Sequence, residues 1–284
     1  REDKPMYEID FSHSIKTVIK KFPQFQDLFI LPIGDLHIGA KSSSWQDSIM
    51  IIDKLIKEYP ALQLIGVGDY GDNATKSSKA SVYENVMNPK EQLSIFKDSF
   101  IKRYKDRWLG LVSGNHEFNR LEKDTGIDPV EELAELFDIP YSRSTMLFDL
   151  SVSEKMGVSK NSKKRGYNFL IQVTHGSSGA QTKGGQHNAA VKTSKKIENA
   201  NIYITGHTHY PSSGVSGKMF YDKRNKVVRF ENRIIMTCTS WLGYEQYADR
   251  RNFEPTGYAL QILKLSGKYK KEMELITKIL SVRR

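Results

Sequence analysis

Cysteine is almost absent from this chain of 284 residues. The single cysteine, Cys238, lies in the apolar run IIMTCTSW, where a lone cysteine is typical of a small core residue. One cysteine excludes an intramolecular disulfide and any zinc site built from several thiolates. We therefore expect a cytoplasmic protein, in which a metal site must be built from His, Asp, Glu or Asn side chains.

Long hydrophobic runs are absent as well. No apolar segment approaches the roughly 20 residues that a membrane-spanning helix needs, and no signal peptide is recognisable. Hydrophobic residues make up 38% of the chain and charged residues 27%, which is typical of a globular protein. We expect no membrane partner.

Acidic residues are outnumbered, with 33 Asp and Glu against 43 Lys and Arg, so that the formal net charge is +10. This balance favours polyanionic partners such as DNA or RNA. Basic clusters occur at residues 160–165, 192–196 and 268–271, and each is equally well explained as a solvated surface. The oligomeric state has no signature in the sequence.

Apolar runs and helical patterns alternate along the chain, and this predicts an α/β fold in one domain, residues 1–284. Asn88 and Asp128, each followed by Pro and then Glu, predict helix starts. Further helices are expected at 45–59 and 188–198, and residues 272–280 fit a strand or a short helix. We expect residues 210–284 to complete the second sheet and to end in a basic tail. Strands are expected at 28–33, 62–67, 108–112, 167–174, 201–205, 227–230, 233–239 and 258–265.

Five of the expected strands end in the same way, with a Gly next to Asp, Asn or His. Five of the seven histidines of the chain lie at these strand ends. Ligand sites of α/β sheets gather at the carboxyl ends of strands, and glycine lets the chain turn sharply there. Each motif alone is weak, but the ordered set predicts one site. The segments are 34–37 (GDLH), 68–73 (GDYGDN), 114–117 (GNHE), 175–176 (HG) and 206–209 (GHTH).

This order of motifs resembles the calcineurin-like metallophosphoesterase superfamily, whose members share D-x-H, GD, GNH-[DE], H and GH-x-H. The matching positions run from Asp35 to His209, and the chain after His209 carries no comparable motif. The resemblance implies a four-layered αββα sandwich with a two-metal site at the ends of its sheets.

The resemblance also implies the ligands, which are seven side chains around two divalent ions. Asp69 would bridge the ions, and His116 would be the catalytic histidine near the substrate. One ion would be held by Asp35, His37, Asp69 and His209, and the other by Asp69, Asn115, His175 and His207.

These residue types fit phosphoester hydrolysis, because two cations roughly 3.5–4 Å apart can activate a water and clamp the phosphoryl oxygens. Mixed His, Asp and Asn ligands suit Mn, Fe, Zn, Co or Ni better than Ca or Mg, and we expect Mn. A histidine can protonate the leaving alkoxide, and a carboxylate would be its partner. Asp72 and Glu117 are both candidates for that partner. Arg120 could reach a phosphate, but an exposed arginine is the favoured interpretation.

The motifs fix the reaction type and leave the substrate open. GDYGDN and LVSGNHE resemble the GDYVDRG and LLRGNHE motifs of serine/threonine protein phosphatases, but Asn73 and Ser113 stand where those enzymes have arginines. A phosphodiester carries one negative charge and needs less clamping, so we expect a phosphodiesterase, with a DNA nuclease as one form of it. The alternatives are a phosphomonoesterase acting on phosphoprotein or nucleotide, and a non-catalytic scaffold that keeps the fold.

Two further features bear on the substrate. The segment 241–247 (WLGYEQY) has aromatic residues that could stack on bases, although a packing role is at least as good an explanation. The whole chain also resembles uncharacterised metallophosphatases of phages and Gram-positive bacteria, which share GDY, SGNHE and a segment like residues 78–84.

Overall fold

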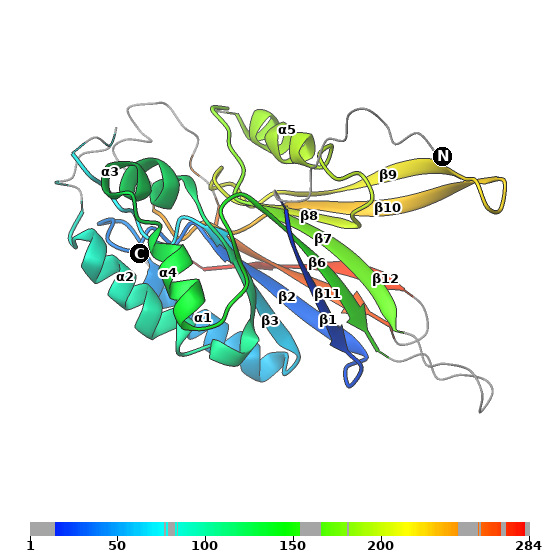
Figure 1. The fold of residues 1–284 in the computed structure, drawn as a ribbon, viewed down its shortest axis with the longest axis horizontal. Helices are drawn as coiled ribbons and strands as arrows, with labels where there is room; N and C mark the ends of the chain where they lie inside the picture. The colour runs from blue at the N-terminus through cyan, green and yellow to red at the C-terminus, as the bar shows by residue number, and fades with distance from the viewer. Residues whose placement is uncertain are drawn as a thin grey trace, which may run out of the picture.

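Two six-stranded β-sheets face each other in the computed structural model of this chain (Figure 1). The structure describes residues 15–76, 78, 83, 85–153, 166–180, 182–243, 255, 257–267 and 271–281. In sheet A the strands follow the order β1 (Lys16–Phe22), β6 (Thr145–Val152), β7 (Tyr167–Thr174), β8 (Ile202–Thr205), β10 (Val227–Thr237) and β9 (Ser213–Asp222). In sheet B the order is β12 (Glu272–Ile279), β11 (Ala259–Ser266), β2 (Asp27–Gly34), β3 (Leu62–Gly68), β4 (Trp108–Val112) and β5 (Tyr141–Ser142).

Helices cover the outer faces of the two sheets. The longer helices are α1 (Trp45–Glu58), α2 (Pro89–Phe96), α4 (Pro129–Leu136) and α5 (Lys183–Thr193). Shorter helical segments are the π-helical η2 (Lys97–Ile101) and η4 (Glu117–Glu122), the 3-10 turn η3 (Lys105–Arg107) and α3 (Lys123–Thr125). No helix in the described part of the chain is long and apolar enough to cross a membrane.

Three separate hydrophobic cores show the layers. Ile52 of α1 and Leu133 of α4 pack with Leu64 of sheet B in the first core. Between the sheets, a second core joins side chains of both, among them Ile30 and Ile171. A small third core packs Ala190 of α5 on the outer face of sheet A. The fold is therefore the expected four-layered αββα sandwich.

Parallel strands bring their carboxyl ends to one edge of each sheet. β2, β3 and β4 are parallel neighbours in sheet B, and β7, β8 and β10 are parallel neighbours in sheet A. Because the two sheets pack face to face, the segments that follow β2, β3, β4, β7 and β8 can meet at one end of the sandwich. These are the five segments that carry the Asp, Asn and His motifs.

Local sequence signals explain several elements. The side chain of Asn88 accepts a hydrogen bond from the Glu91 N–H, and the Glu91 carboxylate accepts one from the Asn88 N–H, so α2 starts with a capping box. The Asp128 carboxylate caps α4 in a similar way. Residues 227–239, expected as two strands, form one strand, β10, to Thr237, and residues 272–279 form strand β12.

Two expectations differ from the structure. The helix expected at 188–198 is α5, which starts within the expected glycine loop, because the Thr182 hydroxyl caps it by accepting the Gly185 N–H at 3.2 Å. The strands after residue 210 were expected to complete the second sheet, but they divide between the two sheets. β9 and β10 extend sheet A, whereas β11 and β12 extend sheet B. The basic segment 160–165 and residues 268–270 lie outside the described residues.

Candidate metal centre

The structure brings all seven predicted ligand residues together at the strand ends. Asp35, His37 and Asp69 are nearly fully buried, as is His175, whereas Asn115, His207 and His209 are partly buried. Six residues in these motifs have a backbone in the left-handed region, which is rare except for Asn, Asp and His. Such backbone strain is concentrated at functional sites, where the surrounding fold enforces it. The six are Asp35, His37, Asp69, Asn73, His207 and His209.

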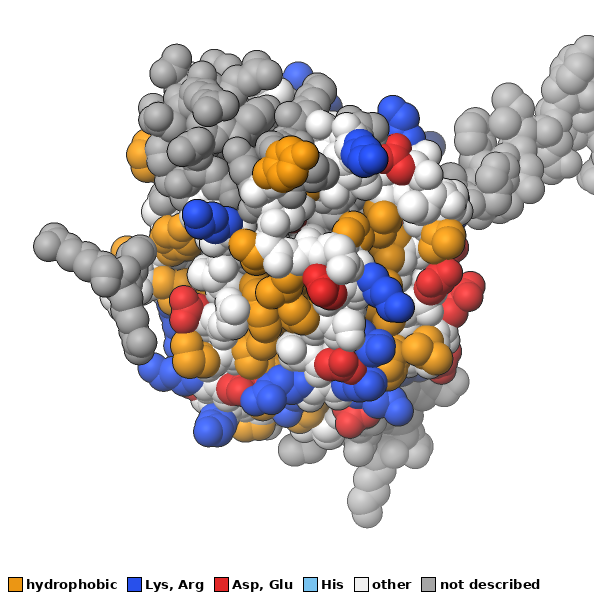
Figure 2. All heavy atoms as spheres, turned by 90° about the vertical axis from the view of Figure 1, so that its left-hand side faces the viewer, with side chains coloured by type: hydrophobic (Ala, Val, Ile, Leu, Met, Phe, Trp, Pro, Cys, Tyr) orange, Lys and Arg blue, Asp and Glu red, His pale blue; other side chains and the backbone are white. Residues whose placement is uncertain are grey.

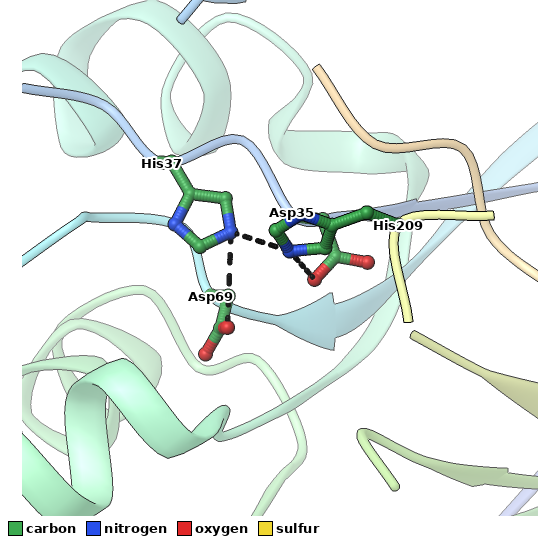
Figure 3. Close-up of side chains that lie close together, drawn as sticks. All are labelled: Asp35, His37, Asp69 and His209. Carbon is green, nitrogen blue, oxygen red and sulfur yellow. Dashed lines mark hydrogen bonds and ion pairs between the residues drawn. The ribbon is translucent and has the colours of Figure 1, made fainter. Parts of the chain in front are cut away.

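One group of donor atoms comes from Asp35, His37, Asp69 and His209 (Figure 3). The Nε2 atoms of His37 and His209 are 3.0 Å apart. The Asp35 carboxylate is 3.5 Å from His209 Nε2, and Asp69 Oδ2 is 3.8 Å from His37 Nε2. Such spacings are those of neighbouring ligands around one cation.

A second group comes from Asp69, Asn115, His175 and His207. His175 Nε2 lies 3.2 Å from Asp69 Oδ2 and 3.0 Å from Asn115 Oδ1. His207 Nδ1 lies 2.6 Å from the same Asn115 oxygen. Asp69 belongs to both groups and lies between them, where a bridging carboxylate would have to be.

The hydrogen bonds of His175 and His207 that point away from Asn115 indicate that this second group requires a positive charge. Backbone carbonyls only accept, so His175 donates from Nδ1 to Val67 O at 2.8 Å, and His207 donates from Nε2 to Ser178 O at 3.2 Å. In the neutral rings the other nitrogens then carry lone pairs, and these point at the Asn115 oxygen. Acceptors that face one another repel unless a positive charge lies among them. The donor set therefore fits a metal cation.

The charges of the site lead to the same conclusion. Burial alone would raise the pKa of Asp69, but His116, His175 and His37 hold it well below its usual value. Burial lowers the pKa of His209 to about 4. Burial would also lower the pKa of His175, but the Asp69 carboxylate raises it to about 10. The Asp69 carboxylate thus favours a positive charge at this place, which a bound cation would supply.

The two candidate partners of His116 have different positions. His116 Nδ1 lies 2.8 Å from the Asp72 carbonyl oxygen and 3.2 Å from its carboxylate, whereas His116 Nε2 lies 3.7 Å from Asp69 Oδ2. The Glu117 carboxylate instead accepts N–H groups from Asp69, Tyr70 and Gly114 at 2.9 Å. Asp72 therefore lies beside His116, and Glu117 holds the backbone of the two loops.

Asp72 also connects His116 to the rest of the site. Its Oδ1 lies 3.3 Å from His37 Nδ1, and Arg120 donates to its carbonyl at 2.7 Å and to its carboxylate at 3.2 Å. Burial would raise the pKa of Asp72, but hydrogen bonds from His116 and His37 hold it far below its usual value. Arg120 is not the exposed arginine expected from the sequence, because its side chain is only 17% exposed.

Sequence reasoning missed Cys238 as part of this site. Its thiol donates to Asp35 Oδ2 at 3.3 Å, and the His207 N–H donates to the same carboxylate oxygen at 3.0 Å. Cys238 directly follows a parallel strand, as the ligands do, and this placement was the available signal. His187 lies apart on α5, with Nδ1 3.2 Å from Ser212 Oγ. Trp241 is buried in the first core, and residues 244–247 lie outside the described residues.

Comparison with known proteins agrees with this geometry. Residues 30–211 match the family model of calcineurin-like phosphoesterases, which is more than half of the chain. The chain belongs to the calcineurin-like phosphoesterase family. The matched region contains all the predicted ligands and His116, and membership supports metal-dependent phosphoester hydrolysis. A comparison with curated proteins found no match.

Solved structures with some likeness are distant from this phosphoesterase. The calcineurin-like phosphoesterase YfkN from Bacillus subtilis has a TM-score of 0.44 and 12% identity, over 90% of this chain and 91% of its own. GAP50 of Plasmodium has a TM-score of 0.40 and 10% identity, over 91% and 90%. Vps29 complexed with zinc, from Entamoeba histolytica, has a TM-score of 0.35 and 14% identity, over 88% and 99%.

Proposed function

We propose that this protein hydrolyses phosphodiesters at a centre of two divalent metal ions. The observation that carries the proposal is the convergence of two donor groups on Asp69, with acceptor atoms facing one another. One ion would be held by Asp35, His37, Asp69 and His209, and the other by Asp69, Asn115, His175 and His207. Mn is the metal that we expect, with Fe, Zn, Co and Ni as alternatives.

When bound, the two ions would activate a water and neutralise the phosphoryl oxygens. His116 would donate a proton from Nε2 to the leaving alkoxide, because its other nitrogen is held on the Asp72 carbonyl. Asp72, which stays ionised, would stabilise the imidazolium form of His116. Glu117 would act by fixing the loops that carry Asp69 and Asn115, chiefly through their backbone N–H groups.

The preference for diesters rests on the charges beside the centre. Asn73 is buried and lies 3.4 Å from the Glu117 carboxylate, and Ser113 is also buried. Both side chains are neutral, so neither supplies the positive charge that would bind a dianionic phosphomonoester. Arg120, the guanidinium that contacts the site, is held by Asp72. A singly charged diester fits these surroundings better than a monoester.

The nuclease form of the proposal rests on the net charge of +10. Where Figure 2 shows described residues, at the end of the molecule with α2 and α3, Lys and Arg side chains lie among Asp and Glu side chains. This face has no stripe of one sign, so binding of DNA or RNA requires its own test after the chemistry is known.

The deciding experiment is hydrolysis of bis-p-nitrophenyl phosphate and p-nitrophenyl phosphate by the Mn-loaded protein, with His116→Ala beside it. We expect a diester preference that the variant loses, and DNA would then be assayed. A monoester preference would favour the phosphomonoesterase. No activity on either ester, with no stoichiometric metal, would favour the scaffold.

A further inference from the structure

Strands β9 and β10 extend beyond their sheet as a two-stranded arm (Figure 1). β8 pairs only with Ile234–Thr237 of β10, so in the described part of sheet A residues 227–233 pair with β9 alone. Two-stranded hairpins are at best marginally stable in water unless one face packs on something else. The arm therefore needs a cover for one of its faces.

The two faces of the arm differ in character. The antiparallel register places Met219 opposite Phe230 and Tyr221 opposite Val228, so these four side chains share one face with Val215. Their exposed fractions lie between 58% and 73%. We call Val215, Met219, Tyr221, Val228 and Phe230 the apolar face. The other face is more polar, because Phe220 and Val227 are accompanied there by five charged side chains. These are Lys218, Asp222, Arg229, Glu231 and Arg233.

The apolar face continues the interior of the molecule. Ile234 and Met236, which follow Phe230 at alternate positions of β10, belong to the core between the two sheets. At the base of the arm, a groove of about 650 Å³ is lined by apolar side chains of both sheets, and Glu231 and Lys271 also line it. The apolar lining is Val215, Ile234, Met273 and Leu275. The apolar surface of the core between the sheets therefore continues onto one face of the arm.

Charge decides what can cover this face. Residues 215, 217, 219 and 221 of β9 and residues 228, 230, 232 and 234 of β10 are all uncharged. A nucleic acid or an anionic membrane would need Lys or Arg on the contacting face. Two copies of a chain with net charge +10 repel each other, so a contact between copies needs an uncharged patch.

We propose that the apolar face is the interface of a homodimer, in which the arms of two copies pack against each other around a two-fold axis. In a two-fold dimer the same patch meets itself, and an uncharged apolar patch does so without placing like charges together. The five side chains, each 58% to 73% exposed, form an apolar patch of roughly several hundred Å², a size typical of protein contact sites. A standard interface buries roughly 800 Å² per partner, so this patch would supply much of one.

The test is the mass of the full-length protein in solution, by sedimentation velocity over a concentration series. We expect the wild type to reach about twice the 32.5 kDa of one chain at micromolar concentration. Phe230→Glu and Phe230→Arg should each be monomeric, because each puts like charges on both sides of the interface. An equimolar mixture of the two variants should associate again as a heterodimer.

The control is Ile19→Ser, which changes an apolar side chain that is 73% exposed at the other edge of sheet A, and it should leave the dimer intact. Circular dichroism should show all variants folded, because Phe230 is 64% exposed. A monomeric wild type, whether or not it binds vesicles, overturns the proposal. A dimer that persists in both Phe230 variants also overturns it. Hydrolytic activity does not enter these readouts.

Discussion

His116 and Asp72 are the residues at which metal binding and proton transfer can be separated. We expect His116→Ala to lower kcat for the diester by about 10²–10⁴-fold, because the general acid is lost. Its metal content, measured by atomic emission, should stay that of the wild type, since His116 is in neither proposed ligand set. Asn119→Ala, at an exposed neighbour, is the control. Loss of metal in parallel with activity would make His116 a ligand instead.

Arg120 should act through Asp72, which it contacts by both the carbonyl and the carboxylate. Removing such a supporting contact costs roughly 10-fold in activity, so Arg120→Ala should lower kcat by about that factor and leave KM unchanged. Arg120→Lys should recover part of the loss. Arg143→Ala, at an arginine paired with Glu122 and Glu131, is the matched control. A rise in KM at constant kcat would show that Arg120 contacts the phosphate instead.

Among the structural elements, the loops after β3 and β4 depend on Glu117. Glu117→Gln replaces one carboxylate oxygen by an NH₂ group. Because this NH₂ group faces backbone N–H donors and cannot accept from them, the substitution should destabilise the protein by about 1–3 kcal/mol. Urea denaturation of the metal-free protein would measure this loss. Glu135→Gln, at an exposed glutamate of α4, should unfold like the wild type. Equal stability of the two variants would contradict the role given to Glu117.

The same two loops approach each other closely at Gly114. A Cβ added there would collide with the Oδ1 and backbone N of Asp69. We therefore expect Gly114→Ala to lower metal affinity by displacing Asp69, although Gly114 is no ligand. Gly179→Ala has open space around it and should bind metal normally. Isothermal titration with Mn would compare the two, and equal affinities would refute this packing argument.

The sequence predicted which residues would gather at the site more accurately than it predicted the helices and strands. The gathering of the motif residues was predictable in part, because parallel strands end at a common edge, but the two ligand sets came from the resemblance to the family and stay a prediction. The choice between Asp72 and Glu117 was not predictable, because both follow strand ends and only the packing of the two loops separates them. For the same reason, the split of β9 to β12 between two sheets could not be read from strand patterns.

For the whole molecule, metal should be a large part of stability. The structure buries Asp35 and Asp69 beside five histidines, and a cation bound to the folded state alone shifts unfolding by mass action. At 100 times Kd we expect Mn to raise Tm by roughly 5–10 °C over the protein treated with chelator. Scanning calorimetry would measure the shift, with Ca as the control ion. A Tm unchanged by Mn would speak against a preformed centre.

Residues that contact the site come from a late part of the sequence. Asp35 is the first of its predicted ligands, but two of the groups that hold Asp35 follow β10 in the sequence: the Cys238 thiol and the Trp241 N–H, which donates to the Asp35 carbonyl at 2.9 Å. During synthesis, these two contacts on Asp35 can form only after more than 200 further residues have left the ribosome. A fragment that stops at residue 211 would contain every predicted ligand and still lack the contacts of Cys238 and Trp241 with Asp35.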